Sequence, residues 1–260
     1  MNSESDFIIG VMDSGLGGLS VLNELTQEVR YADYIYYGDL ANSPYGPKPT
    51  KEVERLVRNA VNFLLEKGAN AVLLACNSAT SAAAEPLRKE LSVPVFGMEP
   101  AIKPALSENP GEKVGVLATS LTLREDKFQT LGESLSAAER IHPVNCDGLA
   151  SLIDLGDFPE IMNFLNRIFS DLNENKIQNI VLGCTHYVLM ESVFRKEKPE
   201  LRIYHGNFGT VRHIKNTLNL PDADREPKLE LYLNGGSEKD FELAFNYLNS
   251  SAEKETRYVK

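Results

Sequence analysis

The sequence predicts an α/β fold with two pseudo-symmetric domains, each holding a mostly parallel sheet flanked by helices. Short apolar runs alternate with longer amphipathic segments along most of the 260 residues, which is typical of parallel βαβ units. The pattern of residues 8–14 returns 105 residues later, at residues 113–119. Two similar apolar runs also end in cysteine, at Cys76 and Cys184, 108 residues apart. Two landmarks with nearly the same offset indicate a duplicated half.

The first half is expected to contain four strands, because its apolar runs are short and bounded by turn residues. These strands cover residues 7–12, 34–37, 71–75 and 93–97. Helices are expected from the glycine-rich segment to about residue 30, and over residues 51–67 and 81–91. The helix at 51–67 is the clearest, since its apolar residues recur on one stripe at helical spacing.

A stretch with three prolines, at residues 99–111, is the expected linker to the second half. The second half then repeats the alternation, with its own cysteine strand at residues 180–184. Beyond it we expect a helix at 210–218, an extra strand at 229–233 and a helix at 239–249. The charged tail from residue 250 is expected to fray.

Composition excludes several classes of function. The net charge is −10 and no basic tract occurs, which argues against nucleic acid and anionic membranes as partners. The amino terminus lacks the basic and apolar regions of a secretory signal, so we expect a cytoplasmic protein. Three cysteines argue against a disulfide framework. No CxxC or HxxxH spacing and no Gly-x-Ser-x-Gly occur, so we expect neither a metal site nor a serine hydrolase.

Cys76 and Cys184 are the strongest candidates for chemistry. Each follows a buried strand, and open α/β sheets place their sites at the carboxyl ends of such strands. Two halves that face each other would place both thiols across one cleft, which suits a reaction that needs a base and an acid. Helix starts and neighbouring polar groups are expected to lower the thiol pKa values. The alternative is a pair of small buried side chains, and Cys146, which has no matched partner, is expected not to be catalytic.

Two loops are candidates for lining this site. The segment from Asp13 to Gly18 is rich in glycine but matches neither the dinucleotide nor the P-loop fingerprint. We interpret it as a tight turn that exposes Asp13 and Ser14 and frees helix-start amides for a carboxylate, with a simple capped turn as the alternative. A second loop, with Pro44, Tyr45 and Gly46, follows the strand at 34–37 and is either a site loop or a plain turn.

These motifs together resemble those of the bacterial glutamate racemases, a family of the cofactor-independent aspartate/glutamate racemase superfamily. The matching pieces are Asp13-Ser14-Gly15-x-Gly17-Gly18, Pro44-Tyr45-Gly46, Ala75-Cys76-Asn77, Glu99-Pro100 and Leu182-Gly183-Cys184-Thr185-His186-Tyr187. The resemblance implies that the carboxyl-terminal segment returns to the first domain. The domains are then residues 1–98 with 211–260, and residues 99–210, with the active site in the cleft between them.

The resemblance also implies interconversion of L- and D-glutamate by two thiols, without a cofactor, to supply D-glutamate for peptidoglycan, in a protein expected to be a homodimer. Asp13 would support Cys76, His186 would support Cys184, and Asp154 is a possible further helper. The implied substrate-binding residues are neutral donors and their neighbours: Asp13, Ser14, Pro44, Tyr45, Gly46, Asn77, Ser78, Thr119, Thr122, Thr185 and His186.

Several positions depart from the family pattern. Leu40 and Asn42 stand where members commonly have a hydroxyl residue and an arginine, so a hydroxyl and a cation are missing near the site. Ser78 replaces a threonine, Val188 a proline, and Asn207-Phe208-Gly209 a Ser-Gly pair. Two alternatives therefore stay open: a racemase of the same superfamily that acts on aspartate or another amino acid, and a non-catalytic amino-acid-binding protein.

Overall fold

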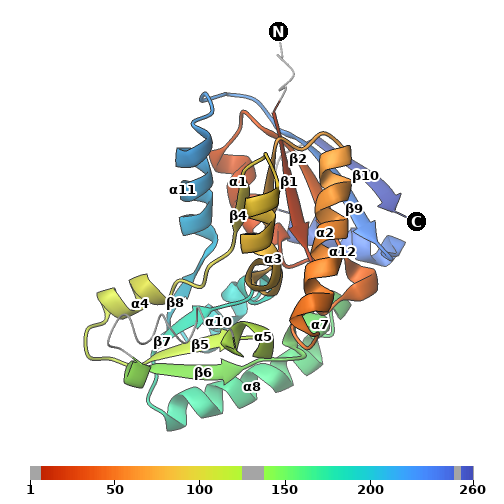
Figure 1. Cartoon of the computed structure of the whole chain (residues 1–260). Coiled ribbons are helices and arrows are strands. Elements are labelled where there is room, and N and C mark those ends of the chain that lie inside the picture. The colour runs from red at the N-terminus through yellow and green to blue at the C-terminus, as the bar shows by residue number, and fades with distance from the viewer. Residues whose placement is uncertain (1–6, 125–137, 249–252, 260) are drawn as a thin grey trace.

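The computed structural model describes residues 7–124, 138–248 and 253–259. Its strands form two sheets, one above the other in the view of Figure 1. Within the described residues all strand pairings are parallel. The α/β class with two helix-flanked parallel sheets is therefore confirmed.

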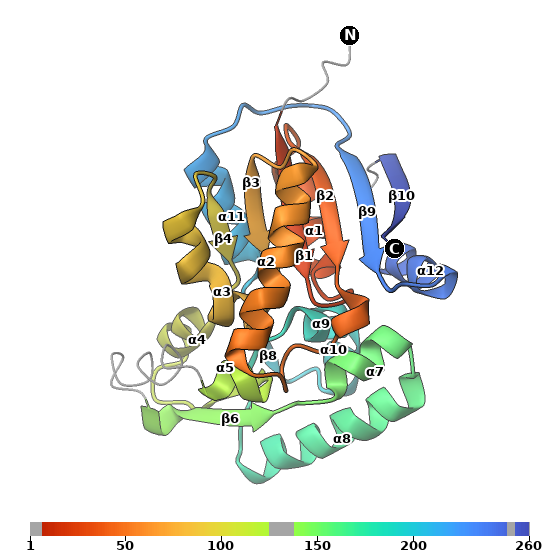
Figure 2. The ribbon, with the colours of Figure 1, turned by 45° about the vertical axis from the view of Figure 1, so that its right-hand side comes forward.

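The first sheet has six strands in the order β10-β9-β2-β1-β3-β4. Its strands are β1 (Ile8–Asp13), β2 (Asp33–Gly38), β3 (Ala71–Leu74), β4 (Val95–Gly97), β9 (Lys228–Asn234) and β10 (Glu253–Val259). One face packs against α1 (Leu19–Glu28), α11 (Asn207–Leu218) and α12 (Glu238–Tyr247). The other face packs against α2 (Thr50–Glu66) and α3 (Asn77–Glu90), which lie in front of the sheet in Figure 2. Burial on both faces explains why the central strands read as continuous apolar runs.

The second sheet has four strands in the order β6-β5-β7-β8. They are β5 (Val114–Ala118), β6 (Ile141–Asn145), β7 (Asn179–Leu182) and β8 (Arg202–His205). Helix α4 (Ile102–Glu108) packs on one face. The other face is covered by α7 (Leu149–Leu155), α8 (Phe158–Glu174), α9 (Thr185–Leu189) and α10 (Glu191–Glu197). Short elements complete this list: α5 (Ser120–Arg124), η1 (Leu40–Asn42) and η2 (Ala138–Arg140).

The two sheets share one topology. The order β2-β1-β3-β4 in the first matches β6-β5-β7-β8 in the second, so the predicted duplication is present in the chain path. In each unit the strand order reverses direction beside the first strand, and ligands bind outside the carboxyl ends of strands at such switch points. Cys76 follows β3 and Cys184 follows β7, which are equivalent strands.

Three expectations about secondary structure were wrong. The helix expected at 81–91 starts at Asn77, because the side chain of Cys76 caps it by accepting from the backbone N–H of Ala79. The expected linker contains α4, whose apolar residues Ile102, Ala105 and Leu106 have helical spacing and pack on the second sheet. The expected fraying tail contains β10, which pairs with β9 along its whole length. The proposed domain boundaries stay a prediction.

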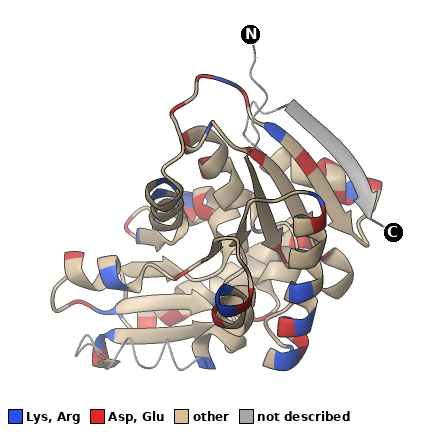
Figure 3. Ribbon diagram, turned by 45° about the horizontal axis from the view of Figure 1, so that its top comes forward, with Lys and Arg blue, Asp and Glu red and all other residues tan. Residues whose placement is uncertain are grey.

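The surface carries both signs of charge. Figure 3 shows Lys and Arg interspersed with Asp and Glu over the helices of this view. Several of them pair at helical spacing, as in Lys89 with Glu85 and Arg195 with Glu191. In the described part of the chain, no helix combines the length and the apolar character needed to cross a bilayer.

Candidate active site

Cys76 lies buried at the amino terminus of α3. Its Sγ accepts from the backbone N–H of Ala79 at 3.4 Å and lies 3.6 Å from the hydroxyl of Ser14. Burial, the nearby Asp13 carboxylate and the Cys184 thiol together raise the pKa of the Cys76 thiol to about 12, against the two hydrogen bonds, which lower it. The expected lowering of this pKa was therefore wrong: in this closed site, desolvation outweighs the helix terminus.

Cys184 stands at the start of α9, beside a histidine–aspartate pair. Its Sγ lies 3.7 Å from Nδ1 of His186, and Nε2 of the same ring lies 3.0 Å from Oδ1 of Asp154. The side chains of His186 and Asp154 are only 3% and 11% exposed. The thiol, imidazole and carboxylate thus form a continuous chain of polar contacts.

The electrostatics of this chain favour a charged imidazole. Burial lowers the pKa of His186, but the Asp154 carboxylate and the Cys184 thiol together outweigh it, so that the pKa is raised well above its ordinary value of 6.5. An imidazolium donates from Nδ1 towards Cys184 and from Nε2 to Asp154. The backbone N–H of Gly17 also lies 3.2 Å from Nε2 and can donate to it when that nitrogen carries no proton. His186 therefore has partners in both protonation states.

Asp13 connects the two halves. Its carboxylate is fully buried and accepts from the backbone N–H of Gly15 at 2.8 Å and from the hydroxyl of Thr185 at 3.2 Å. Burial raises the pKa of Asp13, although His186 and both hydrogen bonds lower it. The hydrogen bonds of Cys76 run to Ser14 and Ala79, so Asp13 acts on that thiol through its charge.

The glycines after Asp13 allow the second half to approach this loop closely. A β-carbon at Gly15 would collide with the Asp154 carboxylate, and one at Gly17 would collide with the His186 ring. The freed amides do bind a carboxylate, as expected, but it belongs to the protein: the N–H of Leu16 donates to Asp154 at 3.2 Å. The glycine-rich loop is thus a docking surface for the histidine–aspartate pair.

Three hydroxyl side chains form a second bridge between the halves. Ser78, in the first turn of α3, lies 3.1 Å from the hydroxyl of Thr119, which lies 3.2 Å from that of Thr122. Beside them, Asn77 is buried and its Oδ1 has no hydrogen-bond partner among the described residues. An unpaired buried acceptor is costly, so it marks a position for a donor from a ligand.

The loop with Pro44, Tyr45 and Gly46 lies against the same bridge. A β-carbon at Gly46 would approach Cβ of Thr119 to 2.7 Å, so only glycine fits there. The buried hydroxyl of Tyr45 donates to Asp39 at 2.6 Å. The hydroxyl of Ser43 lies 3.4 Å from Oδ2 of Asp154. Asp39 and Ser43 were missed by the sequence analysis, and their position after a strand, in a loop already singled out, was the available signal.

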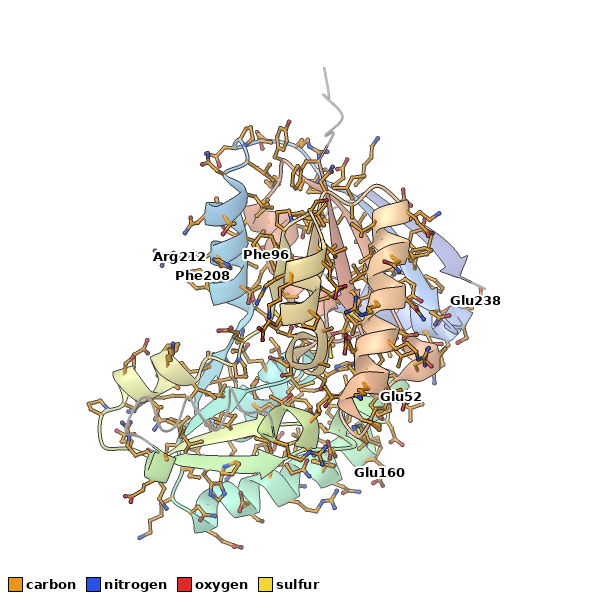
Figure 4. All side chains as sticks on the ribbon, viewed as in Figure 1. Glu52, Phe96, Glu160, Phe208, Arg212 and Glu238 are labelled. Atoms are coloured by element: carbon orange, nitrogen blue, oxygen red, sulfur yellow. The ribbon has the colours of Figure 1, made fainter. Side chains whose placement is uncertain are left out.

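Other candidate positions lie apart from this constellation. Cys146 is buried and its Sγ donates to the carbonyl of Val144 at 3.4 Å. Asn42 points its amide at Asp39. Phe208 is 65% exposed on α11, where Figure 4 shows it beside Arg212 at the outer edge of the molecule. Within the described ranges no three His, Cys, Asp or Glu residues are grouped as metal ligands.

The arrangement supplies two thiols in different surroundings. The high pKa of Cys76 keeps it protonated at neutral pH, while Cys184 lies 3.7 Å from Nδ1 of His186. The charge of Cys184 contributes to the raised pKa of Cys76, so the two groups are electrostatically linked. One can remove a proton while the other donates one.

Comparisons with known proteins agree with this chemistry. The model of the Asp/Glu/Hydantoin racemase family matches residues 9–207. A glutamate racemase of Leptospira interrogans is 49% identical over 247 residues, covering 93% of this chain and 96% of that protein. A glutamate racemase of Clostridium botulinum is 40% identical over 255 residues, covering 95% and 99%.

Solved structures give the same result. The crystal structure of a glutamate racemase isoform from Bacillus anthracis superposes with a TM-score of 0.83 at 28% identity, over 98% of both chains. The Escherichia coli glutamate racemase, in complex with L-glutamate and the activator UDP-MurNAc-Ala, gives a TM-score of 0.83 at 26% identity, over 98% of this chain and 99% of that one.

Proposed function

The chain belongs to the Asp/Glu/Hydantoin racemase family, and from this membership and the site we propose that it interconverts L- and D-glutamate. The observation that carries the proposal is the placement of Cys76 and Cys184 after the equivalent strands β3 and β7. Each thiol has its own polar partners, and a hydrogen bond from Thr185 to Asp13 joins the two sets. Inversion at Cα needs a base on one face and an acid on the other, and this pair supplies both without a cofactor.

In this mechanism Cys184 removes the α-proton of L-glutamate and Cys76 protonates the opposite face; the roles exchange for D-glutamate. His186 and Asp154 support Cys184, and Asp13 and Ser14 support Cys76. The bound ammonium group of the substrate would add the positive charge that the surroundings of Cys76 lack. Such a charge lowers the pKa of a neighbouring thiol, which would let Cys76 act as a base on D-glutamate.

The remaining polar groups suit substrate binding. We assign the carboxylates of glutamate to donors of the hydroxyl bridge and the loops: the side chains of Ser14, Ser78, Thr119, Thr122 and Thr185, and the backbone N–H groups of Tyr45 and Gly46. We assign the ammonium group to Oδ1 of Asn77, because this buried acceptor has no hydrogen-bond partner in the part of the chain that the structure describes. Fixed donors in a buried site also stabilise the negative charge that develops when the α-proton leaves.

Circular dichroism with each enantiomer tests the proposal directly. The protein should convert L-glutamate to the racemic mixture without pyridoxal phosphate, metal or nucleotide. In deuterium oxide the product should carry deuterium at Cα, since a thiol exchanges its proton with solvent. A requirement for any added cofactor would overturn the mechanism, and faster turnover of aspartate than of glutamate would assign the protein to a different substrate.

Cysteine variants test the two roles. Cys76→Ala and Cys184→Ala should each abolish racemization. The first should still exchange the α-proton of L-glutamate and the second that of D-glutamate, because one thiol remains to remove and return it. Cys146→Ala is the control and should remain active. Racemization by either single-thiol variant would contradict the two-base mechanism.

The wider role follows from the proposed reaction. We propose that the protein supplies D-glutamate for peptidoglycan, and that it works in the cytoplasm as a homodimer. Growth of a strain without the gene only on added D-glutamate would support the first part, and fractionation and sedimentation of the purified protein would test the others.

A further inference from the structure

A buried carboxylate organises the loop beside the site. Asp39 follows β2 and is 2% exposed. Its oxygens accept from the amide of Asn42 at 2.9 and 3.1 Å, from the hydroxyl of Tyr45 at 2.6 Å and from the amide of Asn234 at 2.6 Å. We call these four residues the Asp39 cluster. All three donors are neutral, so the carboxylate depends on hydrogen bonds to compensate its desolvation.

The three donors come from different parts of the chain. Asn42 ends η1, Tyr45 belongs to the loop that follows, and Asn234 ends β9, which lies outside the duplicated four-strand unit. The turn after Asn234 packs on η1 so closely that a β-carbon at Gly235 would lie 2.7 Å from Cβ of Ala41. The carboxyl-terminal segment is therefore fixed against the loop by both packing and a hydrogen bond.

The loop held by the Asp39 cluster reaches both sides of the site. Gly46 lies against Thr119 of the hydroxyl bridge, and the hydroxyl of Ser43 reaches Asp154 behind His186. Tyr45 is the link, because its hydroxyl donates to Asp39 while the next residue meets Thr119. A displacement at Asp39 would therefore move the residues that face the substrate.

We propose that Asn234 is a positioning residue for substrate binding: through Asp39 and Tyr45 it fixes the 44–46 turn against Thr119. The inference rests on the proposed racemization of glutamate and extends it to a residue far from the thiols in sequence. It also gives Asn42 a role, as a second neutral amide donor to Asp39.

Asn234→Ala tests the proposal. The loss of one hydrogen bond to a buried charge loosens the turn, and we expect KM for both enantiomers to rise by about 10-fold while kcat stays within about twofold. Asn173→Ala, an exposed asparagine of α8, is the matched control and should leave both constants unchanged. Thermal unfolding of each variant checks that the fold is retained.

A double-mutant cycle separates positioning from general destabilisation. Asp39→Ala, which removes the acceptor, should raise KM by a similar factor or more, and the double variant should be no worse than the poorer single one, because both changes break the same contact. Tyr45→Phe removes the hydroxyl that donates to Asp39 and should raise KM as well. This variant provides the test if Asn234→Ala does not fold.

Two results would overturn the proposal: an unchanged KM in folded Asn234→Ala, or effects of Asn234→Ala and Asp39→Ala on KM that simply multiply. Neither result touches the proposed function, which fails only if the unaltered protein does not racemize glutamate.

Discussion

Replacing Asp154 by asparagine removes the charge that keeps His186 protonated. Burial lowers the pKa of His186, and Asp154 together with Cys184 raises it by more. Without the carboxylate, the larger of these two raising influences is lost, so the pKa should fall back towards its ordinary value of 6.5. At pH 8 a group with that pKa is only about 3% protonated, and the imidazolium that supports Cys184 falls by about 30-fold or more.

The expected kinetic result is a loss of about 30-fold in kcat/KM at pH 8, recovered by about tenfold for each pH unit down to 6.5. Because the two enantiomers are equally stable, kcat/KM must fall equally in both directions. The primary isotope effect is directional, however. It should increase with α-deuterated L-glutamate, whose proton Cys184 removes, and decrease with the α-deuterated D enantiomer.

Asp171→Asn is the matched control, since Asp171 pairs with Nε2 of His142 at 2.9 Å outside the site. Circular dichroism progress curves between pH 6 and 9 give all of these quantities. Equal activity of Asp154→Asn and the unaltered protein at pH 8 would refute the assignment of Asp154 as the group that charges His186. The ion pair of His186 and Asp154 should also stabilise the folded protein. This stabilisation should be fully present below pH 6.5 and should be lost as the pH rises through the raised pKa of His186.

Three further predictions follow from the same contacts. Gly17→Ala should reduce kcat by about 100-fold, because the added methyl group displaces the His186 ring. Gly209 has open space where a β-carbon would lie, so Gly209→Ala should remain active in the same assay. The pKa of Cys76 rises from 9.0 to about 12 on folding, so the unfolded chain loses this proton first as the pH increases. The free energy of unfolding, measured with urea under reducing conditions, should therefore fall by about 1 kcal/mol between pH 8 and pH 10 because of Cys76. Cys76→Ala should remove that part of the fall. L-Glutamine and L-aspartate should be poor substrates in coupled assays, since a site built to bind the side-chain carboxylate rejects analogues that lack it or misplace it; turnover equal to that of glutamate would contradict this.

The architecture was predictable because it depends on periodicity. Alternating strands and helices and the offset between residues 8–14 and 113–119 are local patterns, and both survive in the matching strand orders of the two sheets. The errors had different causes. The cap of α3 is local, since Cys76 accepts from Ala79 three residues later, but a thiol is not among the residues that usually cap helices. Strand β10 depends on a partner far away, because it exists by pairing with β9.

The sequence also identified most of the constellation, but not its electrostatics. The motifs identify Cys76, Cys184 and His186. The structure adds the contacts between them: Asp13 accepts from Thr185 next to Cys184, and Asp154 pairs with His186. A sequence cannot show that Cys76 is desolvated while Cys184 faces an imidazole, because burial depends on how the halves close. For the same reason the Asp39 cluster was not predictable: Asn234 and Asp39 are 195 positions apart.

The difference between the two thiols has a consequence for how a duplicated fold can act on mirror-image substrates. Duplication places Cys76 and Cys184 after equivalent strands, yet a symmetric pair would hold two thiols of equal acidity. Here burial and Asp13 raise the pKa of Cys76, whereas Cys184 lies 3.7 Å from Nδ1 of His186. The two thiols therefore meet the substrate from different electrostatic surroundings, although they follow equivalent strands. Because kcat/KM must be equal for two enantiomers of equal stability, any effect of this difference on the two directions is expressed in kcat and KM separately.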